Sequence, residues 1–281
     1  MRRKQFRKKP DPTTSSILTL VSAKAGFKIG TRPTKRLLYN HAMQNWQECA
    51  KSDYGVALTA VQIEQFDVYL RELLEWNQKF NLTAIREPEE IKIKHFLDSL
   101  SVVKAFPRDW APESMIDIGT GAGLPGIPLK IIYSQARLTL VESIKKKAGF
   151  CEHMVALLGL KDITVSTARA EEIGQDPVHR EHYDLALARA VAKMPVLVEY
   201  LLPLVSVGGF VVMQKSASAK EEAEASRNAI RLMGGKLDSI SPVRLPGVED
   251  DRYLVTLEKV KATPAEFPRR VGIPAKSPIQ N

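Results

Sequence analysis

Between residues 59 and 80, apolar side chains recur every three or four positions, the spacing that places them on one face of an α-helix. Thr59, followed three positions later by Gln62, matches a capping box, in which each side chain accepts a hydrogen bond from the other residue's backbone. A helix is therefore predicted from about residue 59 to residue 80. Its predicted inner face consists of Ile63, Phe66, Leu70, Leu73, Leu74 and Asn77.

A second helical segment follows a short polar stretch. Pro88 suits the first turn of a helix, where Glu89 and Glu90 also interact favourably with the positive end of the helix dipole. Apolar positions then continue at helical spacing over residues 91–103. Together the two segments form a predicted N-terminal helical cap over residues 43–108.

From residue 114 onward, short apolar runs alternate with helical stretches, which is typical of a parallel sheet covered on both faces. The final two apolar runs have no helix between them, so they are expected to form an antiparallel hairpin. The predicted class is α/β, with a seven-stranded doubly wound domain over residues 109–260. The predicted strands are 115–119, 137–142, 163–166, 183–188, 209–214, 236–244 and 252–259, and the predicted helices between them include 144–158, 193–204 and 218–232.

The net charge of +9 is unevenly distributed along the chain. Residues 1–42 carry eleven Lys or Arg and a single acid, Asp11, so they contribute +10 and the remainder sums to about −1. Residues 259–281 are again basic, with five cations and one acid, and the predicted C-terminal tail, 261–281, is also rich in proline. Attraction of a nucleic acid would therefore come from the ends of the chain and from local patches.

Residues 1–42 have little apolar periodicity and are expected to be disordered. Three interpretations fit them: an RNA-attracting arm, an organelle transit peptide, or an over-long reading frame whose true start is Met43. We favour the third, because the first amphipathic element begins only after Met43.

The remaining composition limits what else the chain contains. Only two cysteines occur, Cys49 and Cys151, with no partner at metal-ligand spacing, so no metal site is expected and a reducing cytoplasm fits. His179 and His182 lie in a polar stretch without a third ligand nearby. No apolar stretch approaches the roughly 18 residues that span a bilayer, so no transmembrane helix is expected.

A glycine-rich turn follows the first predicted strand, where a doubly wound sheet places its ligand crevice. Gly119, Gly121 and Gly123 belong to it, and the last two begin a GxGxxG pattern that also describes dinucleotide-binding loops. Two residues argue against a diphosphate. The carboxylate of Asp117 would repel it but tolerate a cofactor with a sulfonium cation, and Pro125 removes an N–H donor near the following helix.

Glu142 ends the second predicted strand, where a carboxylate can accept hydrogen bonds from both hydroxyls of a ribose. NAD and S-adenosylmethionine share that contact. Glu142 therefore indicates a nucleoside-containing cofactor without distinguishing between the two.

The segments after the third and fourth strands contain ARAE at 168–171 and ARA at 188–190. The segment after the fourth strand lacks the Asn/Asp-Pro-Pro-aromatic sequence of amino-group methyltransferases. It also lacks the nucleophilic Cys of cytosine-C5 enzymes. A target such as guanine N7 already has a free lone pair and needs no general base, so alignment and electrostatics would suffice. His95 is expected to be a structural hydrogen-bonding group rather than an RNA contact.

Five strings resemble the small-subunit ribosomal RNA guanine-N7 methyltransferases, also called the glucose-inhibited division protein B family. They are HFLDSL at 95–100, DIGTGAGLPGIPLKI at 117–131, ARAEE at 168–172, YDLALARAVAKMPVL at 183–197 and DDRYLVTLEK at 250–259. The C-terminal FPRRVGIPAKSPI is also similar, so the resemblance covers about residues 56–279. It implies a class I, Rossmann-like methyltransferase that transfers a methyl group from S-adenosyl-L-methionine to N7 of guanine 527 in the decoding-region hairpin of 16S rRNA.

The resemblance also implies roles for individual residues. Beside Asp117, Gly121, Gly123 and Glu142, the cofactor contacts would include Gly119, Leu124, Ala170, Glu171 and Arg189. The catalytic cations would be Arg169, Arg189, Lys215 and Arg252. The family usually has glycine after this lysine, whereas this chain has Ser216.

The expected partner is 16S rRNA or the 30S subunit, bound by a monomer, with no membrane and no metal. RNA phosphates are expected to contact Arg169, Lys215, Arg252, Arg269, Arg270 and Lys276. The alternatives are a methyltransferase acting on another RNA or a small molecule, an NAD-dependent oxidoreductase, and a non-catalytic RNA-binding protein with the same fold.

Overall fold

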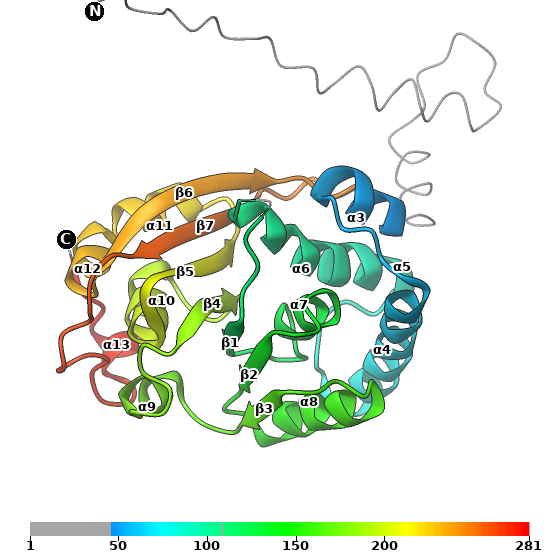
Figure 1. Cartoon of the computed structure of the whole chain (residues 1–281), viewed down its shortest axis with the longest axis horizontal. Coiled ribbons are helices and arrows are strands. Elements are labelled where there is room, and N and C mark those ends of the chain that lie inside the picture. The colour runs from blue at the N-terminus through cyan, green and yellow to red at the C-terminus, as the bar shows by residue number, and fades with distance from the viewer. Residues whose placement is uncertain (1–45, 108, 281) are drawn as a thin grey trace, which may run out of the picture.

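A computed structural model describes residues 46–107 and 109–280 of the chain (Figure 1). The predictions for residues 1–42 fall outside the described residues.

Within the described residues, one seven-stranded sheet has the order β3-β2-β1-β4-β5-β7-β6. Neighbouring strands are parallel, except that β7 runs antiparallel to both β5 and β6. This confirms the doubly wound α/β class and the terminal hairpin. The strands are β1 (Ser114–Ile118), β2 (Arg137–Val141), β3 (Ile163–Ser166), β4 (Tyr183–Arg189), β5 (Val205–Lys215), β6 (Gly235–Val243) and β7 (Arg252–Lys259).

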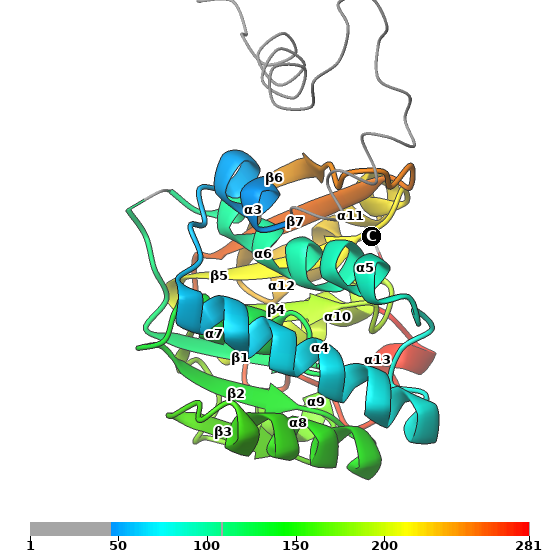
Figure 2. The same ribbon diagram turned by 90° about the vertical axis from the view of Figure 1, so that its right-hand side faces the viewer.

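Helices cover both faces of the sheet and bury a separate apolar cluster on each face (Figures 1 and 2). The first layer contains α3 (Trp46–Tyr54), α4 (Ala60–Phe80), α5 (Pro88–Ile91), the π-helical turn η1 (Lys92–Leu97), α6 (Asp98–Leu100), the 3-10 turn η2 (Ser101–Ala105), α7 (Gly126–Ile132) and α8 (Lys145–Leu157). The second contains α9 (Ala170–Gln175), α10 (Met194–Leu201), the 3-10 turn η3 (Leu202–Leu204), α11 (Ala219–Glu224), α12 (Arg227–Leu232) and α13 (Ile273–Lys276).

The predicted capping box at the start of α4 is present. The Gln62 backbone N–H donates to the Thr59 hydroxyl at 3.3 Å, and the Thr59 N–H donates to Gln62 Oε1 at 2.9 Å. The inner face differs from the prediction, because it buries Tyr69 and leaves Leu70 and Leu74 partly exposed. A tyrosine can be buried on this helix face because its hydroxyl bonds to a buried acceptor in another element.

Two predicted helices are shorter than their apolar patterns suggest. Within the predicted helix 193–204, α10 ends at Leu201, and the last three residues form the 3-10 turn η3, which contains Pro203. The 218–232 pattern is divided into α11 and α12 at Ser226, whose hydroxyl donates to the Glu222 carbonyl oxygen at 2.6 Å. A serine side chain that bonds to the preceding turn competes with the helical backbone ladder.

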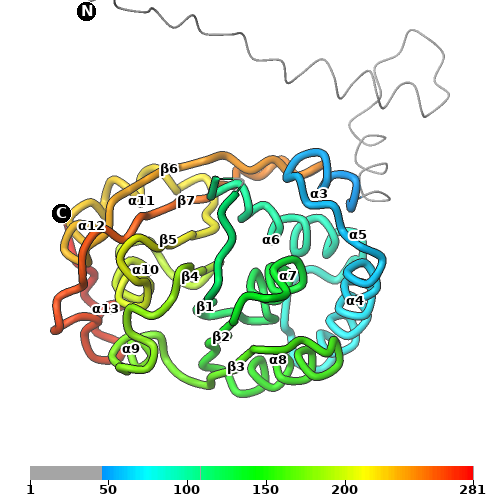
Figure 3. The backbone as a smooth tube through the Cα atoms, viewed as in Figure 1, coloured from blue at the N-terminus to red at the C-terminus, as the bar shows by residue number. Residues whose placement is uncertain are grey.

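The C-terminal segment lies against α9 and α10 (Figure 3). The Arg180 guanidinium donates to four carbonyl oxygens, among them those of Phe267 and Thr263. Arg269 forms two parallel contacts with the buried carboxylate of Glu199, Nε to Oε1 at 2.9 Å and Nη2 to Oε2 at 2.6 Å. The Arg269 guanidinium thus neutralises an acid inside the fold, and its expected contact with RNA stays a prediction.

Candidate functional site

The glycine-rich turn after β1 is built over a buried carboxylate. Asp117 Oδ2 accepts hydrogen bonds from the Thr120 hydroxyl at 2.6 Å and from the Gly126 backbone N–H at 2.9 Å. The Tyr69 hydroxyl reaches the turn from α4 and donates to the Ala122 carbonyl oxygen. Asp117 thus holds the turn from beneath, whereas the sequence had suggested a direct cofactor contact.

The turn requires glycine at positions where the backbone is left-handed or closely packed. Gly119 has φ +66°, and a Cβ there would lie 2.6 Å from a methyl carbon of Val191. Gly123 has φ +87°, and a Cβ there would lie 2.4 Å from the Ile127 side chain. L-residues are strained in this region of backbone space, so the close turn depends on glycine.

Burial raises the pKa of Asp117 to about 7, and the hydrogen bonds from Thr120 and Gly126 oppose this shift. Because the folded-state pKa exceeds the unfolded one, the contribution of Asp117 to stability is complete below pH 4 and is lost as pH rises through 7. Asp117→Asn should therefore gain stability relative to the native protein as pH increases from 4 to 7, by up to about 1.4 kcal/mol per pH unit, and no further above that. Urea unfolding across this range measures the difference, and a difference that does not vary with pH contradicts the prediction.

A cavity of about 260 Å³ lies beside the turn at the carboxyl ends of β1 and β2, and we call it the glycine-turn cavity. Segments distant in the sequence meet in its wall. The residues that line it include Gly119, Ser143, Arg169, Ala170, Glu171, Val191, Tyr200, Val271, Gly272 and Ala275.

Glu142 is buried at the end of β2, next to Ser143 in the cavity wall. Its Oε2 accepts from the Gly121 N–H at 3.0 Å and its Oε1 from the Ile144 N–H at 2.8 Å. A carboxylate has about four acceptor positions, so two remain for hydroxyl groups. Glu142 therefore both braces the turn and can accept further hydrogen bonds.

Glu171 joins the cavity wall to the C-terminal segment. Its Oε1 accepts from the Tyr200 hydroxyl at 3.2 Å and from the Gly272 N–H at 2.8 Å. Sequence reasoning identified Glu171 but missed Tyr200 and Gly272, because neither lies in a recognisable motif. The C-terminal segment consequently forms part of the wall.

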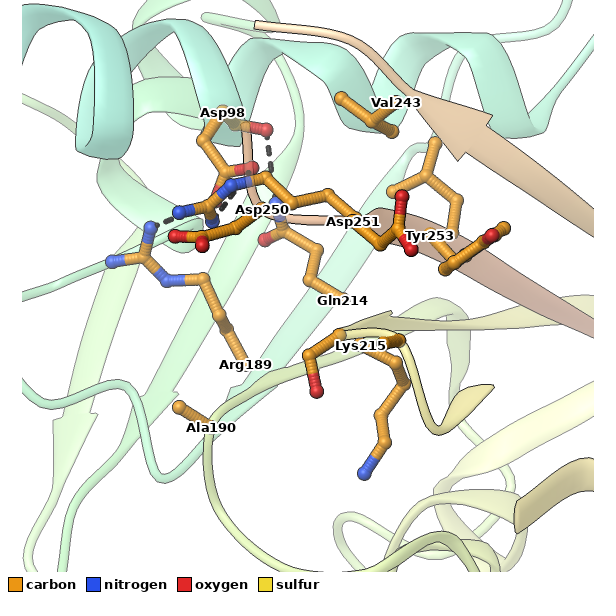
Figure 4. A pocket seen from close by; sticks show the side chains of 13 residues that line it. Asp98, Arg189, Ala190, Gln214, Lys215, Val243, Asp250, Asp251 and Tyr253 are labelled. Carbon is orange, nitrogen blue, oxygen red and sulfur yellow. Dashed lines mark hydrogen bonds and ion pairs between the residues drawn. The ribbon is translucent and has the colours of Figure 1, made fainter. Parts of the chain in front are cut away.

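A second pocket, of about 440 Å³, lies at the carboxyl ends of β4 and β5 and at the start of β7 (Figure 4). We call it the arginine pocket. Three of the four predicted catalytic cations line it, and three acids lie beside them, so its formal charges are balanced. The cations are Arg189, Lys215 and Arg252, and the acids are Asp98, Asp250 and Asp251.

The buried side chain of Asp98 connects two of these cations. Its Oδ2 lies 3.1 Å from Arg189 Nη1, and its Oδ1 lies 3.6 Å from Arg252 Nη1. The Asp98 carbonyl oxygen also accepts from Gln214 Nε2 at 2.9 Å. Asp98 was not predicted as a site residue, although an acid among the apolar residues of HFLDSL is the feature that could have identified it.

His95 belongs to the π-helical turn η1, and its ring lies beside the side chain of Arg189. Its Nε2 is 2.7 Å from the Thr83 hydroxyl, which agrees with the predicted structural hydrogen bond. Burial, followed by the charge of Arg189, lowers the pKa of His95 to about 3. The ring is therefore neutral at physiological pH.

The Lys215 ammonium pairs with Glu222 Oε2 at 2.6 Å and donates to the Ala192 carbonyl oxygen at 3.1 Å. Two buried atoms of the pocket residues, Gln214 Oε1 and Arg252 Nε, have no hydrogen-bond partner in the part of the chain that the structure describes. Buried polar atoms without a partner are uncommon in folded proteins.

The structure separates Arg169 from the other three predicted cations, because Arg169 lines the glycine-turn cavity. Arg189 and Ala190 line the arginine pocket, whereas Val191 lines the cavity. Residues 189–191 therefore border both spaces. Ala190 has φ 56°, a conformation that costs energy for a residue with a Cβ and that is concentrated at functional sites.

The remaining predicted cofactor residues shape the turn. Asp117, Gly121, Gly123 and Leu124 lie in or under it, Glu142 braces it, and none of these five is part of the cavity wall. In the described part of the chain, no helix is long and apolar enough to cross a membrane. No cluster of three or more potential metal-binding side chains occurs among these residues.

The sheet order, the reversed β7 and the glycine turn at the end of β1 define a class I S-adenosylmethionine-dependent methyltransferase. Residues 62–249 match the family model described as rRNA small subunit methyltransferase G. Proteins named ribosomal RNA small subunit methyltransferase G are similar over most of their length. The protein from Roseiflexus castenholzii is 50% identical over 81% of this chain and 96% of its own, and that from Alkaliphilus metalliredigens is 48% identical over 81% and 95%.

The chain belongs to the rRNA small subunit methyltransferase G family. This membership confirms the resemblance seen in the sequence. It also removes the NAD-dependent oxidoreductase from the alternatives, because the family's reaction is methyl transfer.

Proposed function

We propose that this protein transfers the methyl group of S-adenosylmethionine to N7 of a guanine in 16S rRNA. Family membership supports the reaction, and the observation that supports the site is the shared border at residues 189–191. A cofactor in the glycine-turn cavity and a base in the arginine pocket would meet across that segment.

The glycine-turn cavity fits a nucleoside cofactor. A Cβ on the wall residue Gly119 would lie 2.6 Å from Val191, and Glu142, next to the wall residue Ser143, retains acceptor positions for ribose hydroxyls. We propose that Ala170 and Glu171 bind the adenine end. When bound, S-adenosylmethionine supplies an electrophilic methyl group on a sulfonium cation.

The chemistry at guanine needs no general base. N7 attacks the methyl carbon with its own lone pair while the carbon–sulfur bond breaks, and no proton leaves. Positive charge passes from sulfur to the purine ring, so the total charge of the site stays constant. We propose that Arg189 and Arg252 hold the base through O6 or phosphate oxygens, while Asp98 and its neighbouring acids accommodate the cationic product.

Guanine N7 faces the deep, narrow groove of A-form RNA, so the base must be exposed or turned out to react. We propose that the chain acts as a monomer in the cytoplasm, on 16S rRNA or the 30S subunit.

The test is transfer of radiolabelled methyl groups to naked 16S rRNA and to 30S particles lacking the modification. The expected product is one 7-methylguanosine in the decoding-region hairpin, located by cleavage at the methylated base. Calorimetry should show binding of S-adenosylhomocysteine and none of NADH. Methylation only of another nucleotide or of small molecules would overturn the proposal.

A further inference from the structure

Three consecutive lysines, Lys145, Lys146 and Lys147, begin α8 two positions after the cavity residue Ser143. This first turn contains no acid, and its N-cap residue, Ile144, makes no side-chain capping bond. The amino end of a helix carries partial positive charge, so three cations there are unfavourable for the helix. An arrangement that opposes local stability at the rim of a cavity suggests a binding role.

The lysines are available to a partner. Lys145 and Lys146 are exposed and Lys147 is half-buried, and none pairs with a carboxylate among the described residues. The Lys146 ammonium lies 5.6 Å from the centre of the Phe80 ring, a contact that leaves most of its hydrogen-bond donors unused.

Further cations lie along the same edge of the sheet. The loops that follow parallel strands emerge at one edge, so residues 145–147 after β2, Lys193 after β4 and Lys220 after β5 share it. Lys193 and Lys220 are both exposed. From β2 to β5 this edge crosses three strand spacings, roughly 14 Å, and both pockets open along it.

The opposite edge has a different character. The exposed cations Arg137 and Lys161 there lie among the exposed acids Glu113 and Asp162. Exposed acids, Asp250 and Asp251, also lie at the edge that carries both pockets, so its distinguishing feature is the run of three adjacent lysines without a carboxylate partner among the described residues.

We propose that Lys145, Lys146 and Lys147, together with Lys193 and Lys220, bind the phosphates of the RNA that flanks the target nucleotide. This inference rests on the proposed function, and it adds phosphate contacts to those expected from the sequence. A polyanion satisfies all five ammonium groups without needing a shaped pocket. Binding of RNA phosphates also accounts for the three lysines at the amino end of α8, where their charge is unfavourable for the helix.

The test compares two variants that lose the same charge. The first is K145Q/K146Q/K147Q, and the control is R137Q/K161Q/K236Q, whose exposed cations lie at the opposite edge. Filter binding of 16S rRNA is measured at several salt concentrations. The first variant should lose at least tenfold in affinity at about 100 mM salt, and its log-log salt slope should fall by about 2 units, near 0.7 per phosphate contact.

The control should change affinity less than threefold. The first variant should keep or raise the native Tm and keep its affinity for S-adenosylhomocysteine, because it removes unfavourable helix charges and no cavity residue. A second variant, K193Q/K220Q, should lower the slope by about 1 unit. Equal losses in the first variant and the control, or an unchanged slope in both rim variants, would overturn the inference. If the native enzyme modifies guanine N7 while the slopes stay unchanged, the proposed function stands and only this inference fails.

Discussion

Arg189→Ala is expected to slow methyl transfer by 100-fold or more while reducing RNA affinity by less than tenfold. Arg189 lies where the glycine-turn cavity and the arginine pocket meet, so its donors act on the aligned base more than on the RNA as a whole. Removing one preorganised donor from a reacting centre commonly costs 10² to 10³ in rate. Single-turnover transfer to 30S particles, beside filter binding, measures the two quantities.

Arg189→Lys is the matched control, because it retains the charge but not the planar guanidinium, whose Nη1 donates to both Asp98 Oδ2 and the Lys94 carbonyl oxygen. It should recover RNA affinity but only part of the rate. A Tm within a few degrees of the native value shows that each variant is folded. If Arg189→Ala loses turnover and RNA affinity in equal proportion, Arg189 is a plain RNA-binding residue, and the catalytic role is excluded.

Arg269→Ala is expected to destabilise the fold by about 3–5 kcal/mol, because it leaves the fully buried carboxylate of Glu199 without its cationic partner. The backbone N–H of residue 269, which donates to Glu199 Oε1 at 2.8 Å, remains but cannot neutralise the charge. Affinity for S-adenosylhomocysteine should also fall, since the segment it anchors contributes Gly272 to the cavity wall. Urea unfolding and calorimetry measure the two effects.

Arg270→Ala is the matched control, because Arg270 is an exposed neighbour of the same charge. Its cost should stay within about 0.5 kcal/mol. The double variant Glu199→Gln/Arg269→Ala should recover part of the lost stability, since it no longer buries a charge. If Arg269→Ala proved as mild as Arg270→Ala, the ion pair would not anchor the C-terminal segment.

Much of the fold was accessible from local patterns. The capping box at Thr59, the helix of α8 and the terminal hairpin depend on neighbouring residues or on the absence of a connecting helix. The patterns did not predict the break between α11 and α12, where the Ser226 hydroxyl bonds to a backbone carbonyl oxygen of the preceding turn. They also failed for Tyr69, whose burial depends on an acceptor 53 positions away.

The site was accessible in part, because motif residues mark the ends of strands. The glycine turn and Glu142 follow from that rule, whereas the role of Arg189 was implied by the family resemblance. Asp98 was missed although it lies in a motif, since its meaning depends on arginines brought in by β4 and β7. The charge balance of the arginine pocket likewise required the acids to be placed in space.

The sequence by itself determined the order of helices and strands, the class of cofactor and the family, because these depend on side-chain periodicity and on short motifs at strand ends. Only the tertiary structure decided what each charge does. Arg269 and Lys145 are both cations in basic stretches, yet one neutralises a buried acid 70 positions away and the other has no acid partner among the described residues. The physical reason is that an ion pair depends on distance in space and on burial, and neither quantity is encoded in the local spacing of residues along the chain.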